Sequence, residues 1–434
     1  MSGVPSRPTP DRAAQAQAPR TGFGRRAGRV VGVLLGLVAL VWLALGLELE
    51  GFLNRVEPVA LPPVSEAARA LHAASFVADL HADSLLFERD LLRRGRLGHV
   101  DLPRLEEGGV ALQVLGLPTT VYFGTNIDRT EARGPDALTV AGVVRLSWTA
   151  LQSPMARALH HAARARAFAD ASEGRLVLIR DRAALDRLVA ARARGEAVVG
   201  ALLALEGAHA LESDPANLRR AFDAGYRMIG LSHFFDNDYA GSSAGVERHG
   251  LTPLGRATLA EMEALGIAAD LAHLSPAAVD DVLAAATKPV VVSHTGVRGT
   301  CDNARNLSDD QVRRIAAQGG VVGLGFWGVA ACGTTPADVA RSIVHVVRLV
   351  GADHAALGSD YDGATTVGFD VSRLASLTQA LVDTGLSREE IRKVLGENVL
   401  RLLAATLPAT SETAEASTPP KPVDRETAEA AVAD

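Results

Sequence analysis

Five short apolar runs of this chain each end at a His, Asp or Glu side chain. They lie at 76–83, 201–206, 267–273, 290–294 and 355–360. A short apolar run that is bounded by Gly or polar residues predicts a buried parallel strand. Metal-binding side chains at the C-terminal ends of several parallel strands are how a (β/α)8 barrel forms its active site. The pattern therefore predicts an α/β fold, a TIM-like (β/α)8 barrel, and a metal site within it.

The order of the predicted elements supports the same fold. Strands are predicted at 76–80, 110–115, 198–205, 226–231, 267–271, 290–293, 321–325 and 355–358. Helical periodicity fills most of the intervals, as at 254–265, 276–286, 309–318, 336–350 and 371–384. A strand followed by a helix, repeated eight times, is the count of the barrel. The interval 117–197 is unusually long, and its segment 118–133 is expected to cover the substrate.

The N-terminal region predicts a membrane anchor. Residues 1–29 are polar and basic, and residues 30–47 contain no charged side chain. A run of about 18 residues is near the lower limit for a helix that crosses a membrane. The basic residues before the run place the N-terminus in the cytoplasm. We therefore expect a transmembrane anchor at 30–49 in the bacterial inner membrane, with a periplasmic catalytic domain. A cleaved signal peptide is the alternative.

The remaining boundaries follow from composition. Residues 50–70 contain three prolines and are predicted to be a linker, which leaves the barrel domain at 71–405. The tail at 406–434 is rich in Thr, Ser, Pro, Ala and Glu, and this composition predicts disorder.

Charge and cysteine content limit the classes of function. The net charge of −6 is spread along the chain, so there is no basic patch for nucleic acid. Cys301 and Cys332 are too few for a disulfide framework. They either form one bond in an oxidising compartment or are two small buried apolar residues. A homodimer is compatible with the sequence, which has no feature that decides the oligomeric state.

Metal ligands are predicted at the strand ends. His81 and Asp83 are two residues apart in extended chain and therefore face the same side. Glu206 ends the longest run, and its two oxygens can bridge two cations. His273 and His294 end consecutive strands, which makes them neighbours in a barrel; two structural histidines are the alternative. Mixed imidazole and carboxylate ligands suit Zn, Mn, Fe or Co, and two such ions could share a hydroxide that attacks a carbonyl.

Four further residues have predicted roles in the reaction. Asp360 is placed to accept the proton of the hydroxide and pass it to a leaving amine. Asp362 is the second choice for this role. His233, at the end of the fourth strand, could be a further ligand, but five ligands are enough for two bridged ions. It is instead expected to donate a hydrogen bond to the developing oxyanion. Arg305 is expected to bind a substrate carboxylate, although a surface charge is the commoner role of a single Arg.

Several motifs together resemble a known family. They are Asp79-Leu80-His81-Ala82-Asp83, Leu205-Glu206-Gly207-x-His209-Ala210-Leu211, Asp270-Leu271-x-His273-x-Ser275, Ser293-His294, Arg305-Asn306 and Gly358-Ser359-Asp360-Tyr361-Asp362-Gly363. In this order, over about 70–405, they are similar to the membrane (renal-type) dipeptidases, peptidase family M19 of the amidohydrolase superfamily. Residues 118–123 depart from the family's usual segment, so the side-chain preference of the substrate is not predicted.

The resemblance implies a site with two zinc ions. One ion would be held by His81, Asp83 and Glu206, and the other by Glu206, His273 and His294. His233 and Arg305 would contact the substrate, and Asp360 would be the catalytic acid and base.

The predicted function is zinc-dependent hydrolysis of dipeptides. An amidohydrolase that acts on another amide or a lactone is the first alternative, because it would share the metals without needing Arg305. An inactive, membrane-tethered binding protein is the second alternative, and the presence of every expected ligand disfavours it.

Overall fold

A computed structural model describes residues 36, 48–144 and 151–410 of the chain. The chain divides into two units, Met1–Leu47 and Glu48–Asp434, and the fold described below is that of the second unit. The predicted anchor at 30–49 lies almost wholly outside the described residues. Among the residues that are described, no helix is both long and apolar enough to cross a membrane.

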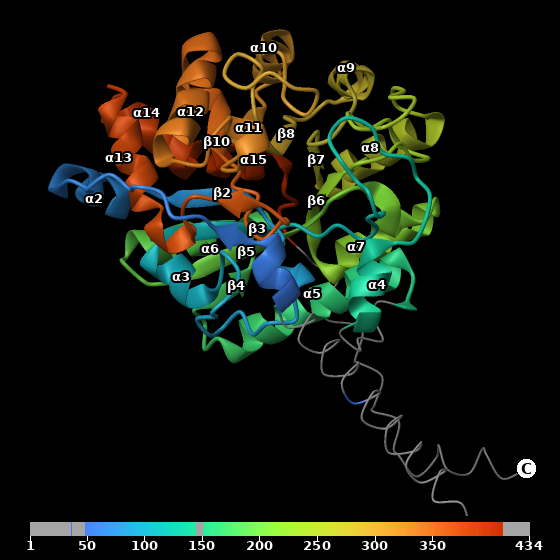
Figure 1. Ribbon diagram of the computed structural model, residues 1–434, viewed down its shortest axis with the longest axis horizontal. Coiled ribbons are helices and arrows are strands. Elements are labelled where there is room, and N and C mark those ends of the chain that lie inside the picture. The colour runs from blue at the N-terminus through green and yellow to red at the C-terminus, as the bar shows by residue number, and fades with distance from the viewer. Residues whose placement is uncertain (1–35, 37–47, 145–150, 411–434) are drawn as a thin grey trace, which may run out of the picture. The chain divides into compact units, whose positions relative to one another are not determined.

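Eight parallel strands close into a barrel (Figure 1). They are β2 (Val77–Ala82), β3 (Val110–Leu115), β5 (Val199–Leu205), β6 (Tyr226–Gly230), β7 (Ala268–Asp270), β8 (Val291–Thr295), β9 (Val321–Leu324) and β10 (Ala355–Leu357). Each strand pairs with the next, β10 pairs with β2, and β3 pairs with β5, so the sheet has no open edge within this ring. The predicted (β/α)8 barrel is thus confirmed, with strand bounds that differ from the predicted ones by at most two residues.

A ninth strand was not predicted. β4 (Leu176–Leu178) lies in the long interval between β3 and β5 and pairs with the first residues of β5. β6 takes up pairing with β5 only from Leu203 onward, so β4 adds to the sheet without entering the ring. Its three residues are too short to show an alternating or continuous apolar pattern.

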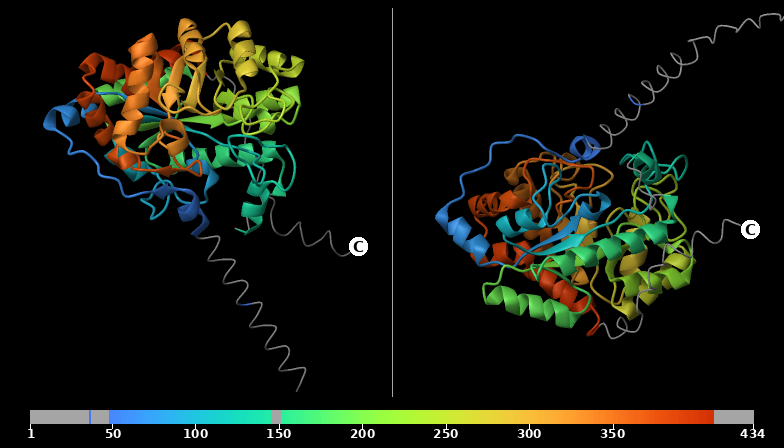
Figure 2. Two further views of the ribbon diagram at one scale, coloured as in Figure 1. Left: turned by 45° about the horizontal axis from the view of Figure 1, so that its top comes forward. Right: turned by 90° about the horizontal axis from the view of Figure 1, so that it is seen from below.

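Helices surround the barrel (Figure 2). They are α2 (Glu66–Ala73), α3 (Leu102–Glu107), α4 (Ala137–Val144), α5 (Pro154–Ala171), α6 (Arg182–Ala193), α7 (Pro215–Ala224), α8 (Pro253–Leu265), α9 (Pro276–Ala285), α10 (Asp309–Ala317), α11 (Gly328–Ala331), α12 (Pro336–Val350), α13 (Ala375–Asp383), α14 (Arg388–Arg392) and α15 (Asn398–Thr406). Three of them, α10, α12 and α14, begin with capping boxes of Ser308 with Gln311, Thr335 with Asp338 and Ser387 with Glu390, which satisfy free backbone N–H groups of the first turn.

The strands are buried along their whole length, because helices cover their outer face and side chains fill the interior. Two buried aspartates fix the strand ends that carry the site. Asp79 in β2 accepts hydrogen bonds from the backbone N–H and the hydroxyl of Ser359, at 2.8 and 2.6 Å. Asp270 in β7 accepts one from the backbone N–H of Ser293, at 2.9 Å. Neighbouring strand ends are therefore joined by side chains as well as by the sheet.

The folded body extends beyond the predicted limits of 71–405. Within the predicted linker at 50–70, residues 48–53 are helical and β1 (Arg55–Val56) pairs with β11 (Thr366–Val367). At the other end, α15 runs to Thr406 and Leu407 is buried. The predicted tail therefore begins in folded chain, and its residues 411–434 lie outside the described part.

Candidate metal centre

The predicted site residues converge at one end of the barrel. Parallel strands all point their C-terminal ends the same way, so the residues that follow them meet at one face. The site residues that leave these ends are His81 and Asp83 from β2, Glu206 from β5, His233 from β6, His273 from β7, His294 within β8 and Asp360 from β10. All of them are buried.

Glu206 is the centre of the group. Its Oε1 lies 3.0 Å from Nε2 of His273 and 3.2 Å from Nε2 of His294, and its Oε2 lies 3.7 Å from Nε2 of His81. Nε2 of His233 is 3.4 Å from Oε1. Burial alone would raise the pKa of Glu206, but the surrounding histidines hold it well below its ordinary value. Glu206 is therefore ionised, with each oxygen facing a different set of imidazoles.

His81 and Asp83 form the second part of the group. Nε2 of His81 lies 3.3 Å from Oδ1 of Asp83, as expected for residues two apart in extended chain. Burial, together with the negative charge of Glu206, raises the pKa of Asp83 to about 6. Burial opposes the charged form of His81, but the carboxylates of Glu206 and Asp83 raise its pKa well above the ordinary value.

The donor atoms fit metal ions better than they fit one another. Nε2 of His273 and Nε2 of His294 face each other at 2.9 Å, and both face Oε1 of Glu206. When one proton lies between the two imidazole nitrogens, it is not available to the carboxylate oxygen, so the three atoms cannot all be hydrogen-bonded to one another. Burial holds the pKa values of His273 and His294 well below the ordinary value, so both are neutral, the form that binds metal.

Three overlapping groups of side chains have the spacing of metal ligands. They are His81, Glu206 and His294; Glu206, His233 and His273; and His81, Asp83 and Asp360. Glu206 belongs to two of the three groups and His81 to two. The structure thus brings together every ligand predicted from the sequence, and it also places His233 and Asp360 in these groups.

Backbone conformation adapts two of these residues to the site. His273 and Asp360 have φ of 66° and 60°, in the left-handed region that non-glycine residues seldom adopt. Gly207, directly after Glu206, has φ of 85°, and a Cβ there would lie 2.4 Å from the ring of His209. His209 is partly buried beside Phe235, and burial lowers its pKa to about 3.

Asp360 is placed to hold a proton. Burial raises the pKa of its carboxyl group well above the ordinary value, and the negative charges of Glu206 and Asp83 raise it further. The positive charges of His81 and Arg305 lower the pKa, but by less. Its neighbour Asp362, the second choice for this role, is engaged elsewhere.

The carboxylate of Asp362 is held by three partners that sequence reasoning missed. One oxygen accepts a hydrogen bond from the hydroxyl of Ser84 at 2.6 Å and contacts the guanidinium of Arg89. The other accepts one from the backbone N–H of His99 at 2.6 Å. Burial opposes ionisation of Asp362, but the charge of Arg89, together with His99 and the hydrogen bond from Ser84, more than compensates, so the pKa of Asp362 is lowered. Asp362 thus fixes the loop that carries Asp360. Arg89 and His99 do not follow a strand end of the ring, and Ser84, which does follow β2, is not a metal-binding residue type. The pattern of metal ligands at strand ends could therefore not identify them.

Arg305 lies beside the site on the segment after β8. Its Nη2 donates to the backbone carbonyl of His294 at 2.8 Å, and its Nη1 lies 3.3 Å from the hydroxyl of Thr295. It is buried, which lowers its pKa, whereas Asp360 and Glu206 favour its charged form. The prediction that Arg305 belongs to the site and not to the surface agrees with this position.

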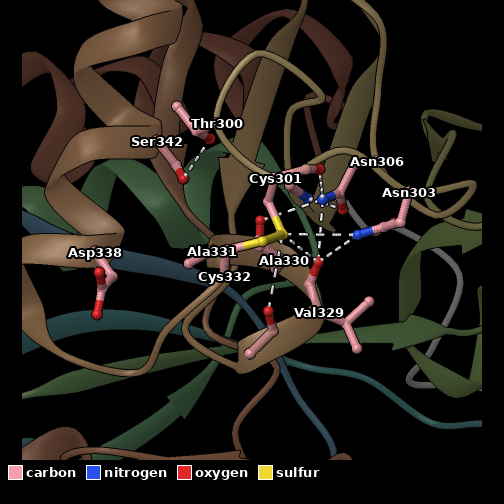
Figure 3. Close-up of a disulfide and its surroundings, with 12 residues drawn as sticks. Thr300, Cys301, Asn303, Asn306, Val329, Ala330, Ala331, Cys332, Asp338 and Ser342 are labelled. Atoms are coloured by element: carbon pink, nitrogen blue, oxygen red, sulfur yellow. Dashed lines mark hydrogen bonds between the residues drawn. A yellow bond between two sulfur atoms is a disulfide. The ribbon is translucent and has the colours of Figure 1, made fainter.

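A disulfide joins the segment that carries Arg305 to α11 (Figure 3). Cys301 and Cys332 are bonded, which decides between the two alternatives left open by the sequence. The side chains of Asn303 and Asn306 both donate to the carbonyl of Val329 in α11, at 2.8 and 3.0 Å. Asn303 Oδ1 also accepts the backbone N–H of Arg305 at 3.0 Å. The backbone of Arg305 is thus fixed from two sides.

A cavity of about 510 Å³ opens at the metal centre and is lined by Asp83, Glu206, His233, His273 and Asp360. The predicted covering segment borders it through Pro118, Val121 and Phe123. The size is that of a pocket for a small molecule.

The sequence profile of the membrane dipeptidase family, peptidase family M19, matches residues 65–417. The chain therefore belongs to this family.

Individual proteins support the assignment. The dipeptidase aclJ of Aspergillus oryzae is 36% identical over 215 residues, which cover 47% of this chain and 51% of that protein. The chain thus spans about half the length of the curated relatives it matches.

Solved structures show the same fold. A metallo peptidase from Rhodobacter sphaeroides, liganded with a phosphinate mimic of the dipeptide L-Ala-D-Ala, has a TM-score of 0.63 and 26% identity, covering 76% of this chain and 99% of that chain. The probable dipeptidase PvdM from Pseudomonas aeruginosa has a TM-score of 0.65 at 19% identity, covering 79% of this chain and 98% of that one, and it shows the fold alone.

Proposed function

We propose that the protein is a zinc-dependent dipeptidase that cleaves the bond before a C-terminal residue with a free carboxylate. The observation that carries the proposal is the convergence of two imidazole nitrogens on one oxygen of Glu206 while the other oxygen faces His81. Membership of the membrane dipeptidase family supports the same activity. The dipeptide mimic in the Rhodobacter sphaeroides relative supports a substrate of this size.

Two ions fit the donor set. His81, Asp83 and Glu206 would hold one zinc, and Glu206, His273 and His294 the other. Bound zinc ions would polarise the scissile carbonyl and lower the pKa of water. Glu206 is suited to bridge them because it is ionised and its two oxygens face different imidazoles.

The other residues act on the substrate. Asp360 takes a proton from the attacking water and passes it to the leaving amine, a role that its raised pKa supports. His233 donates a hydrogen bond to the carbonyl oxygen, where negative charge develops. Arg305 pairs with the C-terminal carboxylate, which requires its side chain to turn from the carbonyl of His294 toward the substrate.

We also propose that residues 30–49 anchor the chain in the bacterial inner membrane with the barrel in the periplasm. The Cys301–Cys332 bond supports this side of the membrane, because disulfides persist in oxidising compartments. A C-terminal tag that is accessible to protease in spheroplasts is the expected result. A protected tag would contradict the orientation, and a mature N-terminus near residue 47 would indicate a cleaved signal peptide.

The activity is tested with the full chain, metal analysis and a set of L-L and L-D dipeptides. We expect two zinc ions per chain, cleavage of dipeptides, and no cleavage of decapeptides. Arg305→Met should raise KM strongly and keep the metals, whereas Arg348→Met, at an exposed position on α12, should change neither. Equal rates on free and C-terminally amidated dipeptides would contradict the proposal and favour an amidohydrolase of another substrate class. Absence of turnover with both metals bound would favour a binding protein.

A further inference from the structure

The segment at 48–56 lies outside the stretch that matches the family, yet it packs against the site. The matched stretch begins at residue 65. Residues 48–53 are helical, and β1 pairs in parallel with β11 in the loop after Asp360. The backbone N–H of Arg55 donates to the carbonyl of Thr365 at 3.2 Å, and that of Glu57 donates to the carbonyl of Val367 at 2.8 Å.

A buried ion pair attaches the same segment to the site. Oε1 of Glu50 lies 2.7 Å from Nε of Arg89, and Arg89 also contacts the carboxylate of Asp362. The Glu50 and Arg89 side chains are only 9% and 12% exposed, and that of Asp362 is fully buried. One guanidinium therefore pairs with two carboxylates, one from the 48–53 helix and one from the loop of Asp360. Because buried charges need partners, this contact holds the helix in place.

The helix presents two leucines to the cavity. Leu49 and Leu53 are four residues apart, so they lie on the same helical face. Both line the 510 Å³ cavity that opens at the metal centre. Much of the remaining outer wall is apolar and includes Leu86, Phe123 and Leu138 of α4. Figure 2 shows the helix at 48–53 and α4 on the same side of the barrel.

The order of the strands in the barrel indicates which part of a substrate would contact this apolar wall. In the ring, β8 is four strands away from β3 in either direction, so the segments that follow them lie on opposite sides of the barrel mouth. Arg305 follows β8 and is absent from the lining of the cavity, whereas Phe123 and Leu138 follow β3. A dipeptide with its carboxylate at Arg305 and its carbonyl at the metal centre therefore directs its N-terminal residue toward the apolar wall.

From this arrangement we propose that residues 48–56 complete a subsite that selects dipeptides with a large apolar N-terminal side chain. The proposal rests on the dipeptidase function proposed above. Leu49 and Leu53 form one wall of the subsite, and the segment after β3 forms the other. The Glu50–Arg89 ion pair fixes the position of the first wall relative to the loop of Asp360.

The test compares L-Leu-L-Ala with L-Ala-L-Ala, which differ only in the N-terminal side chain. For the full-length, metal-loaded protein we expect kcat/KM to be at least about tenfold higher for L-Leu-L-Ala, since each added methylene in an apolar pocket is worth about that much or more. Leu49→Ala/Leu53→Ala should remove most of this preference through a higher KM for L-Leu-L-Ala. The rate of this double variant on L-Ala-L-Ala should stay within about twofold of the rate of the unmodified protein. Phe52→Ala is the matched control, because Phe52 lies on the same helix, is 66% exposed and does not line the cavity.

A second variant keeps the proposal testable if the double variant does not fold. Phe123→Ala changes the opposite wall at a 59% exposed position and should cause the same selective loss. Cleavage of L-Ala-L-Ala without preference for L-Leu-L-Ala would overturn the subsite and leave the dipeptidase function intact. An equal loss on both substrates in the variants would also overturn it. Absence of cleavage of either dipeptide would instead refute the function on which the proposal rests.

Discussion

Removal of the Cys301–Cys332 bond should both destabilise the protein and weaken substrate binding. The bond closes a loop with a sequence separation of 31. The chain-entropy relation gives a stabilisation of about 3.7 kcal/mol for a loop of this length. A folded body of roughly 350 residues has an unfolding entropy that converts this value into a fall in Tm of about 5 °C.

The effect on binding follows from where the bond lies. Asn303 and Asn306 keep their hydrogen bonds to Val329 when the sulfurs are separated, so the segment of Arg305 should loosen without detaching. We therefore expect KM for a dipeptide to rise, with a smaller change in kcat.

The assay compares Cys301→Ser/Cys332→Ser with the unmodified protein by thermal unfolding, with and without a reducing agent. Reductant should lower the Tm of the unmodified protein toward that of the variant and leave the variant unchanged. A variant that melts within about 1 °C of the unmodified protein would refute the entropic argument. An unchanged KM in a clearly destabilised variant would refute the coupling to Arg305.

Three further outcomes are expected. Glu206→Ala removes a ligand from both ions, so metal analysis should find both lost or weakly held, whereas His294→Ala should empty mainly one; two retained ions in Glu206→Ala would exclude the bridging role. Asp360→Asn should lower kcat by about 10²-fold or more with metal content unchanged, and near-normal turnover would assign the proton to another residue. Burial, with the nearby charge of Arg164, lowers the pKa of His161 to about 3. The unfolded chain then binds the extra proton below about pH 6.5, so stability is complete above that pH and falls by at most about 1.4 kcal/mol per unit below it. Denaturation at pH 7 and pH 5.5 should show this loss in the unmodified protein and a smaller one in His161→Gln; equal losses would contradict the assignment.

Features that depend on one local stretch of chain could be predicted from the sequence. A buried parallel strand is a continuous apolar run, and the residue that ends it lies at the barrel mouth. The same apolar runs therefore predicted both the strands and the positions of His81, Glu206, His273 and His294. The left-handed backbone of His273 and Asp360 could not be predicted, because tertiary contacts impose it on residues that do not favour it.

Features that depend on distant partners were missed. Arg89 and His99 meet Asp362 across 273 and 263 residues, and nothing local marks either as part of a site. The segment at 50–70 was predicted to be a linker because of its prolines. Its strand β1 forms only by pairing with β11, about 310 residues later, and so leaves no local periodicity to detect.

The attachment of the 48–53 helix also bears on how a shortened form of this protein should be made. Trimming the chain to residue 65, where similarity to the family begins, is the natural choice for a soluble preparation. Such a protein would keep every proposed metal ligand and would pass a test of metal content. It would nevertheless lack Leu49 and Leu53 from the cavity and Glu50 from Arg89. Specificity profiles collected on that fragment would then describe an enlarged pocket, and inhibitors optimised against it would be fitted to space that the full chain fills.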